Sequence, residues 1–356
     1  MAAVTCEIIV ACGRNKTLQQ TCCFFFCTIA LFIETVEVGA RVYYYGWDIL
    51  RPSLGRSIPY LGNPNISQPS SIGLSVELKP NIRTRFRKVI LETNSQGLRD
   101  KEYEIKKPDN TFRVAVLGDS FTMPSGVAIE DAYHTLLEDR YNAQSYTLDY
   151  EFINFGVDGY SLKDYLLQLQ HVVPPYEPDL ILVGFMPGND TQEVLPANVE
   201  KLVPASNFWA YILAVILHGK DAIHPQVHNT WSTAVAKGIS PNPLDKMIRS
   251  NEPYLRKMFA QIAAETTEKG MPVLVANMEY KTVHPLLLTL LREITEEHGM
   301  SFVDTSVHFE GMDKSSLMIY RADGHTNAKA NRIFADVIYE ELQRSNLIPS
   351  DTHIPQ

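Results

Sequence analysis

The chain of 356 residues is long enough to bury a full hydrophobic core, and 45% of its residues are hydrophobic, which excludes a mainly disordered protein. Its 32 basic and 41 acidic residues give a net charge of -9, and no cluster of lysine and arginine alternates with aromatic residues. A surface that follows a phosphate backbone is therefore not expected, and we expect no nucleic acid among the partners.

The N-terminal region contains an uncharged segment between Lys16 and Glu34, TLQQTCCFFFCTIALFI, close to the lower limit of about 17 residues for a helix that crosses a bilayer. Arg14 and Lys16 precede this segment and Glu34 and Glu37 follow it, which places the N-terminus in the cytoplasm and the rest of the chain outside. We therefore expect residues 1–40 to form a tail and a membrane anchor or signal-anchor. A buried N-terminal helix of the soluble domain is the alternative, because apolar runs this short are ambiguous.

Cysteine and histidine positions argue against a metal site in the body of the chain. The last cysteine is Cys27, so the rest of the chain has neither a disulfide nor a thiolate metal ligand. His224 and His228 are four residues apart, but Pro225 between them predicts a loop.

Two segments lack the pattern of regular elements. Residues 41–110 carry several prolines and no sustained period of 2 or 3.6, which predicts an extended lead-in that wraps the next domain. Residues 191–245 are too many for a simple connection and contain the apolar patch FWAYILAVIL. We expect a helical insertion there, as a cap, a membrane-facing surface or a buried structural helix. Residues 346–356 form a polar tail that we expect to be loose.

Residues 111–345 show short apolar runs that alternate with helical patterns. This alternation predicts an α/β domain with a parallel sheet of about five strands and helical crossovers, closed by a final helix that begins near Asn327. The predicted strands are TFRVAVL, YEFINF, DLILVGF, MPVLVAN and SFVDT.

Loops that follow the first three strands carry residues suited to acyl transfer. The tripeptide Gly-Asp-Ser at 118–120 places Ser120 at the carboxyl end of the first strand, where open α/β sheets build their sites. The second strand leads into Gly156 and the third into Asn189, at the same edge of the sheet. The N–H groups of Ser120 and Gly156 and the side-chain amide of Asn189 can therefore converge on one oxygen as an oxyanion hole.

A base for the serine is expected near the C-terminus, where Asp323-Gly324-His325 precedes the last helix. A hydroxyl is a poor nucleophile until a neighbouring base accepts its proton, and an imidazole held by a carboxylate suits this task. We assign Ser120 as the nucleophile, His325 as its base and Asp323 as the residue that orients the base.

Together these blocks, in this order, resemble those of SGNH (GDSL-like) hydrolases over about Phe112 to Leu342. The lead-in stretch from Asn94 to Asp100 and the anchor are similar to those of membrane-tethered bacterial members. The resemblance implies a flavodoxin-like three-layer α/β/α sandwich, a Ser-His-Asp triad, a three-donor oxyanion hole and neither metal nor cofactor. Two departures are a phenylalanine after Ser120 and a single residue between Asp323 and His325, a spacing also shown by related carbohydrate O-acetyltransferases.

The resemblance implies a membrane-anchored serine esterase whose catalytic domain is extracytoplasmic, either periplasmic or extracellular. Its substrate would be a small-molecule or glycan ester, with an acyl or acetyl group on a carbohydrate or lipid, cleaved through an acyl-enzyme. The first alternative is an O-acyltransferase that acts on an extracytoplasmic polysaccharide. The second is a non-catalytic SGNH domain that serves as a glycan-binding or assembly module.

Overall fold

The computed structural model places its described residues in two compact units. Helix α2, Lys16–Tyr45, belongs to the first unit and covers the segment predicted as the membrane anchor. Across the described ranges, no helix is both long enough and apolar enough to cross a membrane. His224, His228, the C-terminal tail and nearly all of the predicted insertion lie outside these ranges, which are 16–45, 66–87, 89–145, 147–191, 241–282, 284–320 and 323–349.

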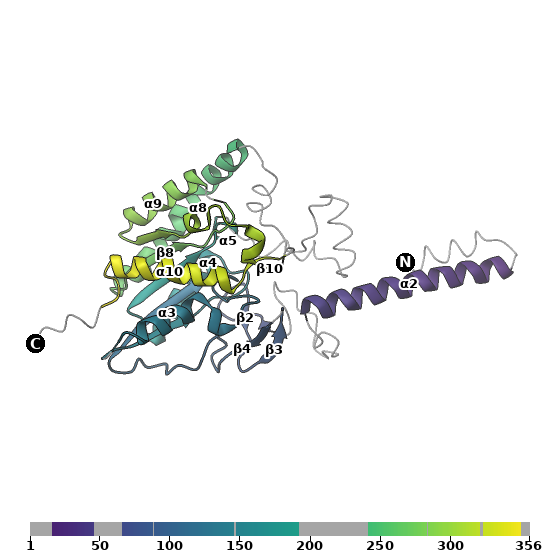
Figure 1. Cartoon of the computed structure of the whole chain (residues 1–356), viewed down its shortest axis with the longest axis horizontal. Coiled ribbons are helices and arrows are strands. Elements are labelled where there is room, and N and C mark those ends of the chain that lie inside the picture. Colours follow the sequence, from purple (N-terminus) through teal and green to yellow (C-terminus); the bar gives the residue numbers. More distant parts are fainter. Residues whose placement is uncertain are drawn as a thin grey trace, which may run out of the picture. The chain divides into compact units, whose positions relative to one another are not determined.

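The second unit, which Figure 1 shows with its flanking helices, is built on a five-stranded parallel sheet with the strand order β6-β5-β7-β8-β9. Val114 on the central strand β5 pairs with Phe152 on one side and Leu180 on the other. All five strands coincide with the predicted apolar runs to within two residues, and the predicted fold class is confirmed. Their bounds are Thr111–Gly118 for β5, Asp149–Asn154 for β6, Leu180–Phe185 for β7, Val273–Asn277 for β8 and Ser301–Asp304 for β9.

Helices cover both faces of the sheet because successive side chains of each strand point to opposite faces. Ala115 and Leu117 pack in the core on the side of α4, α8 and α9, whereas Val114 and Val116 pack on the side of α3 and α10. The result is a three-layer α/β/α sandwich. The helices are α3, Tyr133–Asn142; α4, Leu162–His171; α8, Pro241–Glu268; α9, Pro285–Glu297; and α10, Ala328–Arg344.

Helix α8 begins earlier than the helical spacing of the sequence, which starts at Glu252. In the structure α8 begins at Pro241 and continues through Pro253. Packing of Ile248 in the buried core accounts for the extra turns, since it adds apolar burial on the N-terminal side of the proline.

The lead-in forms two small antiparallel strand pairs that the sequence pattern did not predict. Leu78, Phe86 and Leu91 from these strands are buried in the core that α4, α8 and α9 share. The lead-in is therefore part of the hydrophobic core of the domain. The pairs are β1, Ser67–Gln68, with β2, Glu77–Leu78, and β3, Arg83–Phe86, with β4, Val89–Glu92.

The strand order creates a topological switch point at the carboxyl edge of the sheet. The chain leaves β5 toward β6 on one side, and β7 then pairs with β5 on the other side. Open α/β sheets bind ligands outside the carboxyl ends of the strands at such a switch point. The loops after β5 and β7, which carry Ser120 and Asn189, both leave the sheet there. A hairpin of β10, Met318–Tyr320, and β11, Asp323–Thr326, leads into α10.

Candidate active site

Ser120 lies in a tight turn directly after β5 and is buried, with 4% of its surface exposed. The N–H of Met123 donates to the carbonyl of Asp119 at 2.8 Å, so the chain reverses within one turn. A Cβ built on Gly118 would lie 1.9 Å from the Oγ1 of Thr122. Glycine is therefore required at 118, because the turn folds back onto the end of the strand.

A buried arginine from the lead-in holds the loop that follows the nucleophile. The Arg99 guanidinium donates to the carbonyls of Met123 and Pro124 at 2.6 Å and to that of Val127 at 2.7 Å. Burial lowers the pKa of Arg99 to about 10, so the guanidinium is charged at neutral pH. Donation from one charged group to several buried carbonyls fixes this loop relative to the lead-in.

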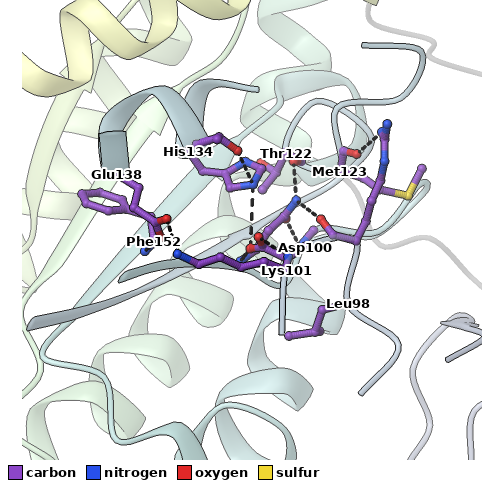
Figure 2. A network of polar contacts seen from close by, with 12 residues as sticks. Leu98, Asp100, Lys101, Thr122, Met123, His134, Glu138 and Phe152 are labelled. Atoms are coloured by element: carbon purple, nitrogen blue, oxygen red, sulfur yellow. Dashed lines mark hydrogen bonds and ion pairs between the residues drawn. The ribbon is translucent and has the colours of Figure 1, made fainter. Parts of the chain in front are cut away.

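Asp100 and Asn154 connect the lead-in to the ends of β5 and β6. Asp100 Oδ2 accepts from the N–H of Asn154 at 2.9 Å, and the Asn154 amide donates to the carbonyl of Thr122 at 3.1 Å. Figure 2 shows Asp100 in the network with Thr122 and Met123. Burial raises the pKa of Asp100 to about 7.

The same network reaches α3 through charged and titratable side chains, as Figure 2 shows. Lys101 Nζ donates to Glu138 Oε1 at 2.5 Å, and His134 Nε2 lies 3.8 Å from Asp100 Oδ2. Burial lowers the pKa of His134 to about 3, so the ring is neutral. These residues line a cavity of about 600 Å³ beside β4. Among the described residues, no hydrogen bond or ion pair joins them to Ser120, so they act on the nucleophile only through the loop that carries it.

The backbone N–H of Gly156 already donates a hydrogen bond within the protein. This N–H donates to Asn154 Oδ1 at 2.8 Å, and a Cβ on Gly156 would lie 2.7 Å from the backbone nitrogen of Met123. The residue has only one N–H, so donation to an oxyanion would require this bond to open, and the predicted oxyanion role of Gly156 stays a prediction. Position 156 requires glycine because the backbone there packs closely against the nucleophile loop. Gly159, in the same loop, has a φ of +85° and open space around its Cβ position.

Asn189 is joined to the nucleophile turn by a carboxylate. It lies in α5, Pro187–Asp190, directly after β7. Its side-chain amide donates to Asp119 Oδ2, while Asp119 Oδ1 accepts from the N–H of Phe121 at 2.9 Å. Burial raises the pKa of Asp119 to about 7. The second N–H of the amide can donate to a substrate oxygen, so the arrangement is compatible with the predicted oxyanion role of Asn189.

Asp190 fixes the position of α5. Its Oδ2 accepts from the N–H of Met186 at 2.7 Å and from the hydroxyl of Tyr165 at 3.4 Å. The carboxyl is fully buried, and burial raises its pKa well above the ordinary value. The residue therefore positions Asn189 from the protein interior.

His325 lies on β11 with 5% of its surface exposed. Its ring lies 5.8 Å from the ring of Phe121, the residue after Ser120, and the hydroxyl of Tyr280 donates to the carbonyl of Gly324 at 2.7 Å. The fold thus brings the predicted base to the nucleophile turn. Asp323 begins β11, but its side chain lies outside what the structure describes, so its orienting role stays a prediction.

An arginine that the sequence did not single out contacts the predicted base. Arg87 Nη1 lies 2.5 Å from His325 Nδ1, and Arg87 Nη2 lies 3.4 Å from Asp158 Oδ2. Arg87 belongs to the lead-in, more than two hundred residues from His325. The sequence holds no local signal for this contact, because it depends on how the β3–β4 pair packs against the site.

The arrangement is suited to covalent acid–base chemistry. It combines a hydroxyl and an amide donor from the loops after β5 and β7 with an imidazole from the β10–β11 hairpin. In the part of the chain that the structure describes, no group of three or more His, Cys, Asp or Glu side chains could hold a metal ion.

Comparison with known proteins gives similarity only at the level of structure. No family model matches the sequence, and no curated protein matches it. TesA matches with 14% identity and a TM-score of 0.43, over 66% of this chain and 99% of that chain. The psychrotrophic esterase EstA from Pseudoalteromonas sp. matches with 18% identity and a TM-score of 0.40, over 67% and 99%. A lipolytic protein of the G-D-S-L family from Desulfitobacterium hafniense matches with 11% identity and a TM-score of 0.37, over 65% and 99%.

With identities of 11–18% and TM-scores below 0.5, these matches carry no argument about activity, which has to be argued from the site.

Proposed function

We propose that the protein is a serine esterase that hydrolyses a carboxylic ester through an acyl-enzyme. The observation that carries the proposal is that the Asp119 carboxylate accepts from both the Phe121 N–H in the nucleophile turn and the Asn189 amide, with His325 packed beside the same turn. A nucleophile and an amide donor held in one rigid unit are what acyl transfer requires, because charge develops on the carbonyl oxygen as the hydroxyl attacks. The resemblance of the four sequence blocks to SGNH hydrolases supports the same reaction.

In the proposed reaction Ser120 Oγ attacks the ester carbonyl while His325 accepts the hydroxyl proton. The tetrahedral intermediate collapses, and His325 returns this proton to the leaving alcohol. A water molecule then attacks the acyl-enzyme, with His325 again as the base, which releases the acid and restores the serine. Asp323 orients His325 in this scheme.

The oxyanion is held by the Ser120 N–H, the second N–H of the Asn189 amide and the N–H of Gly159. Gly159 replaces Gly156 in this role because the N–H of Gly156 already donates to Asn154. The positive φ of Gly159 and the open space around it suit a backbone group that approaches a ligand closely.

The substrate is an acyl or acetyl ester carried by a carbohydrate or a lipid. Transfer of the acyl group to a sugar hydroxyl would use the same acyl-enzyme, and an acceptor assay separates the two reactions. The membrane anchor and the extracytoplasmic location stay predictions from the N-terminal sequence.

The Asn189→Ala variant tests the proposed oxyanion hole. Loss of one donor is expected to lower kcat for acetate release by about 10²–10³, with a smaller effect on KM, because the donor acts mainly in the transition state. Gln170→Ala is a matched control, since Gln170 is an exposed amide at the far end of α4. Full activity of Asn189→Ala on a substrate that the wild type hydrolyses would contradict the assignment.

A further inference from the structure

One buried asparagine joins the two loops that carry the proposed backbone donors of the oxyanion hole. Asn154 is the last residue of β6 and is fully buried. Its side-chain amide donates to the carbonyl of Thr122 at 3.1 Å, and its Oδ1 accepts from the N–H of Gly156 at 2.8 Å. Thr122 follows the nucleophile Ser120 by two residues, and Gly156 precedes Gly159 by three. The amide therefore bridges the nucleophile turn and the loop after β6.

The same two loops are in close contact beside this bridge. A Cβ on Gly156 would lie 2.7 Å from the backbone nitrogen of Met123 and 2.7 Å from the Cβ of Thr122. The N–H of Val157 donates to the carbonyl of Gly118, the last residue of β5, at 3.2 Å. A change in the position of one loop therefore displaces the other, because closely packed groups transmit strain.

The lead-in holds both the backbone and the side chain of Asn154. Asp100 Oδ2 accepts from the backbone N–H of Asn154 at 2.9 Å, and the carbonyl of Arg99 accepts from its side-chain amide at 3.3 Å. The Asp100 side chain is itself 7% exposed, and its Oδ1 accepts from the N–H of Lys101 at 2.8 Å. A flipped Asn154 amide would turn its oxygen toward two carbonyls and its nitrogen toward an N–H group, so the side chain is held in one orientation.

We infer that Asp100 and Asn154 are positioning residues of the proposed active site, which together set the distance between the N–H groups of Ser120 and Gly159. This inference rests on the proposed esterase function. It adds two residues that act through the backbone of the two loops.

The physical reason is that an oxyanion hole works only when its donors converge on one atom. Such donors lie about 2.7–3.1 Å from the oxyanion, and a misplacement of about 1 Å can lower the rate about 10²-fold. The Asn154 side chain fixes the two backbone segments relative to each other, and Asp100 fixes Asn154. Loss of either side chain therefore moves the donors without removing any of them.

The experiment measures hydrolysis of p-nitrophenyl acetate by Asn154→Ala and Asp100→Ala. We expect kcat to fall about 10- to 100-fold and KM to change by less than about threefold, because the donors act mainly in the transition state. Asp100→Asn keeps an oxygen that can accept from the N–H of Asn154, so it should recover most of the loss. Each kcat is divided by the amount of serine that a fluorophosphonate labels at completion, so unfolded protein does not lower the value.

Asn142→Ala is the matched control. The Asn142 amide makes the same kind of bridge at the other end of β6, where it donates to the carbonyl of Tyr150 at 2.9 Å and accepts from the N–H of Tyr150 at 2.8 Å. The control thus removes one asparagine bridge from the same strand, away from the proposed site. Its kcat per labelled serine should equal that of the wild type.

A double-variant cycle with Gly159→Ala separates positioning from a general structural role. If Asn154 acts through the N–H of Gly159, its loss costs little once that N–H is already displaced. The double variant should therefore lose about the same factor in kcat as the more damaging single variant. Independent effects would multiply, and a product of the two single losses would contradict the inference.

Three other results would also overturn the inference: a wild-type kcat per labelled serine in Asn154→Ala, a loss confined to KM, or an Asp100→Asn variant no faster than Asp100→Ala. An equal loss in Asn142→Ala would do the same. With a labelled wild type, these results refute only the positioning role. A folded wild type that the fluorophosphonate does not label refutes the proposed function, and the inference with it.

Discussion

Replacement of Arg99 by methionine tests whether the lead-in holds the nucleophile loop. The variant keeps an apolar stem of similar length but removes the donors to the carbonyls of Met123, Pro124 and Val127. Each buried carbonyl left without a donor costs about 1–3 kcal/mol. The Pro124 carbonyl keeps the N–H of Val127 as a donor at 2.9 Å, so the carbonyls of Met123 and Val127 lose theirs. Full additivity would give roughly 2–6 kcal/mol, and relaxation of the loop toward water favours the lower end, so we expect a loss of about 2 kcal/mol in the free energy of unfolding.

Urea denaturation followed by far-ultraviolet circular dichroism measures this loss. Arg83→Met is the control, because the Arg83 side chain is 72% exposed and its pair with Glu92 is a surface pair, worth less than about 1 kcal/mol. Arg99→Met should also slow fluorophosphonate labelling of Ser120, since the loop after Ser120 loses its anchor. Equal urea midpoints for the two variants, with unchanged labelling, would refute the anchoring role of Arg99.

Two further predictions concern glycine and histidine positions. Gly156→Ala should lower the free energy of unfolding, because the new Cβ would lie 2.7 Å from the backbone nitrogen of Met123. Gly159→Ala should act mainly on kcat by straining a residue at φ +85°. Urea denaturation should therefore show the larger loss of stability for Gly156→Ala, and kinetics should show the larger loss of kcat for Gly159→Ala. The pKa of His134 is about 3 in the folded protein, below the ordinary 6.5, so stability is lost as the pH falls below 6.5. His134→Asn removes this titration. The free energy of unfolding of the wild type, relative to that of the variant, should therefore fall by about 2 kcal/mol between about pH 7 and about pH 5, at about 1.4 kcal/mol per pH unit. If urea denaturation gives the same difference between the two proteins at both pH values, a buried neutral His134 is contradicted.

The sheet and its principal site could be predicted because their signals are local. Strands β5, β7 and β8 are buried along most of their length, so each appears in the sequence as a short, nearly continuous apolar run. Ser120 and Asn189 follow such runs directly, and the parallel arrangement brings the two loops to one edge. Strand order alone is enough to predict their proximity.

The remaining features depend on tertiary packing. Strands β1 to β4 have two to four residues, too few for a period of 2 to be recognised. The choice between Gly156 and Gly159 depends on a hydrogen bond to the Asn154 side chain, which no spacing in the sequence reveals. Arg87 and Arg99 act over long separations in the chain, so their roles become visible only when the lead-in is seen packed on the domain.

The central claim is that Ser120 is an activated nucleophile with His325 as its base. The most direct measurement is labelling of the full-length protein with a fluorophosphonate probe, beside Ser120→Ala and His325→Ala. We predict that the wild type is labelled and that both variants are not, because the probe requires the serine and the serine requires its base. A folded wild type that is not labelled, or a Ser120→Ala variant labelled as strongly as the wild type, would contradict the account.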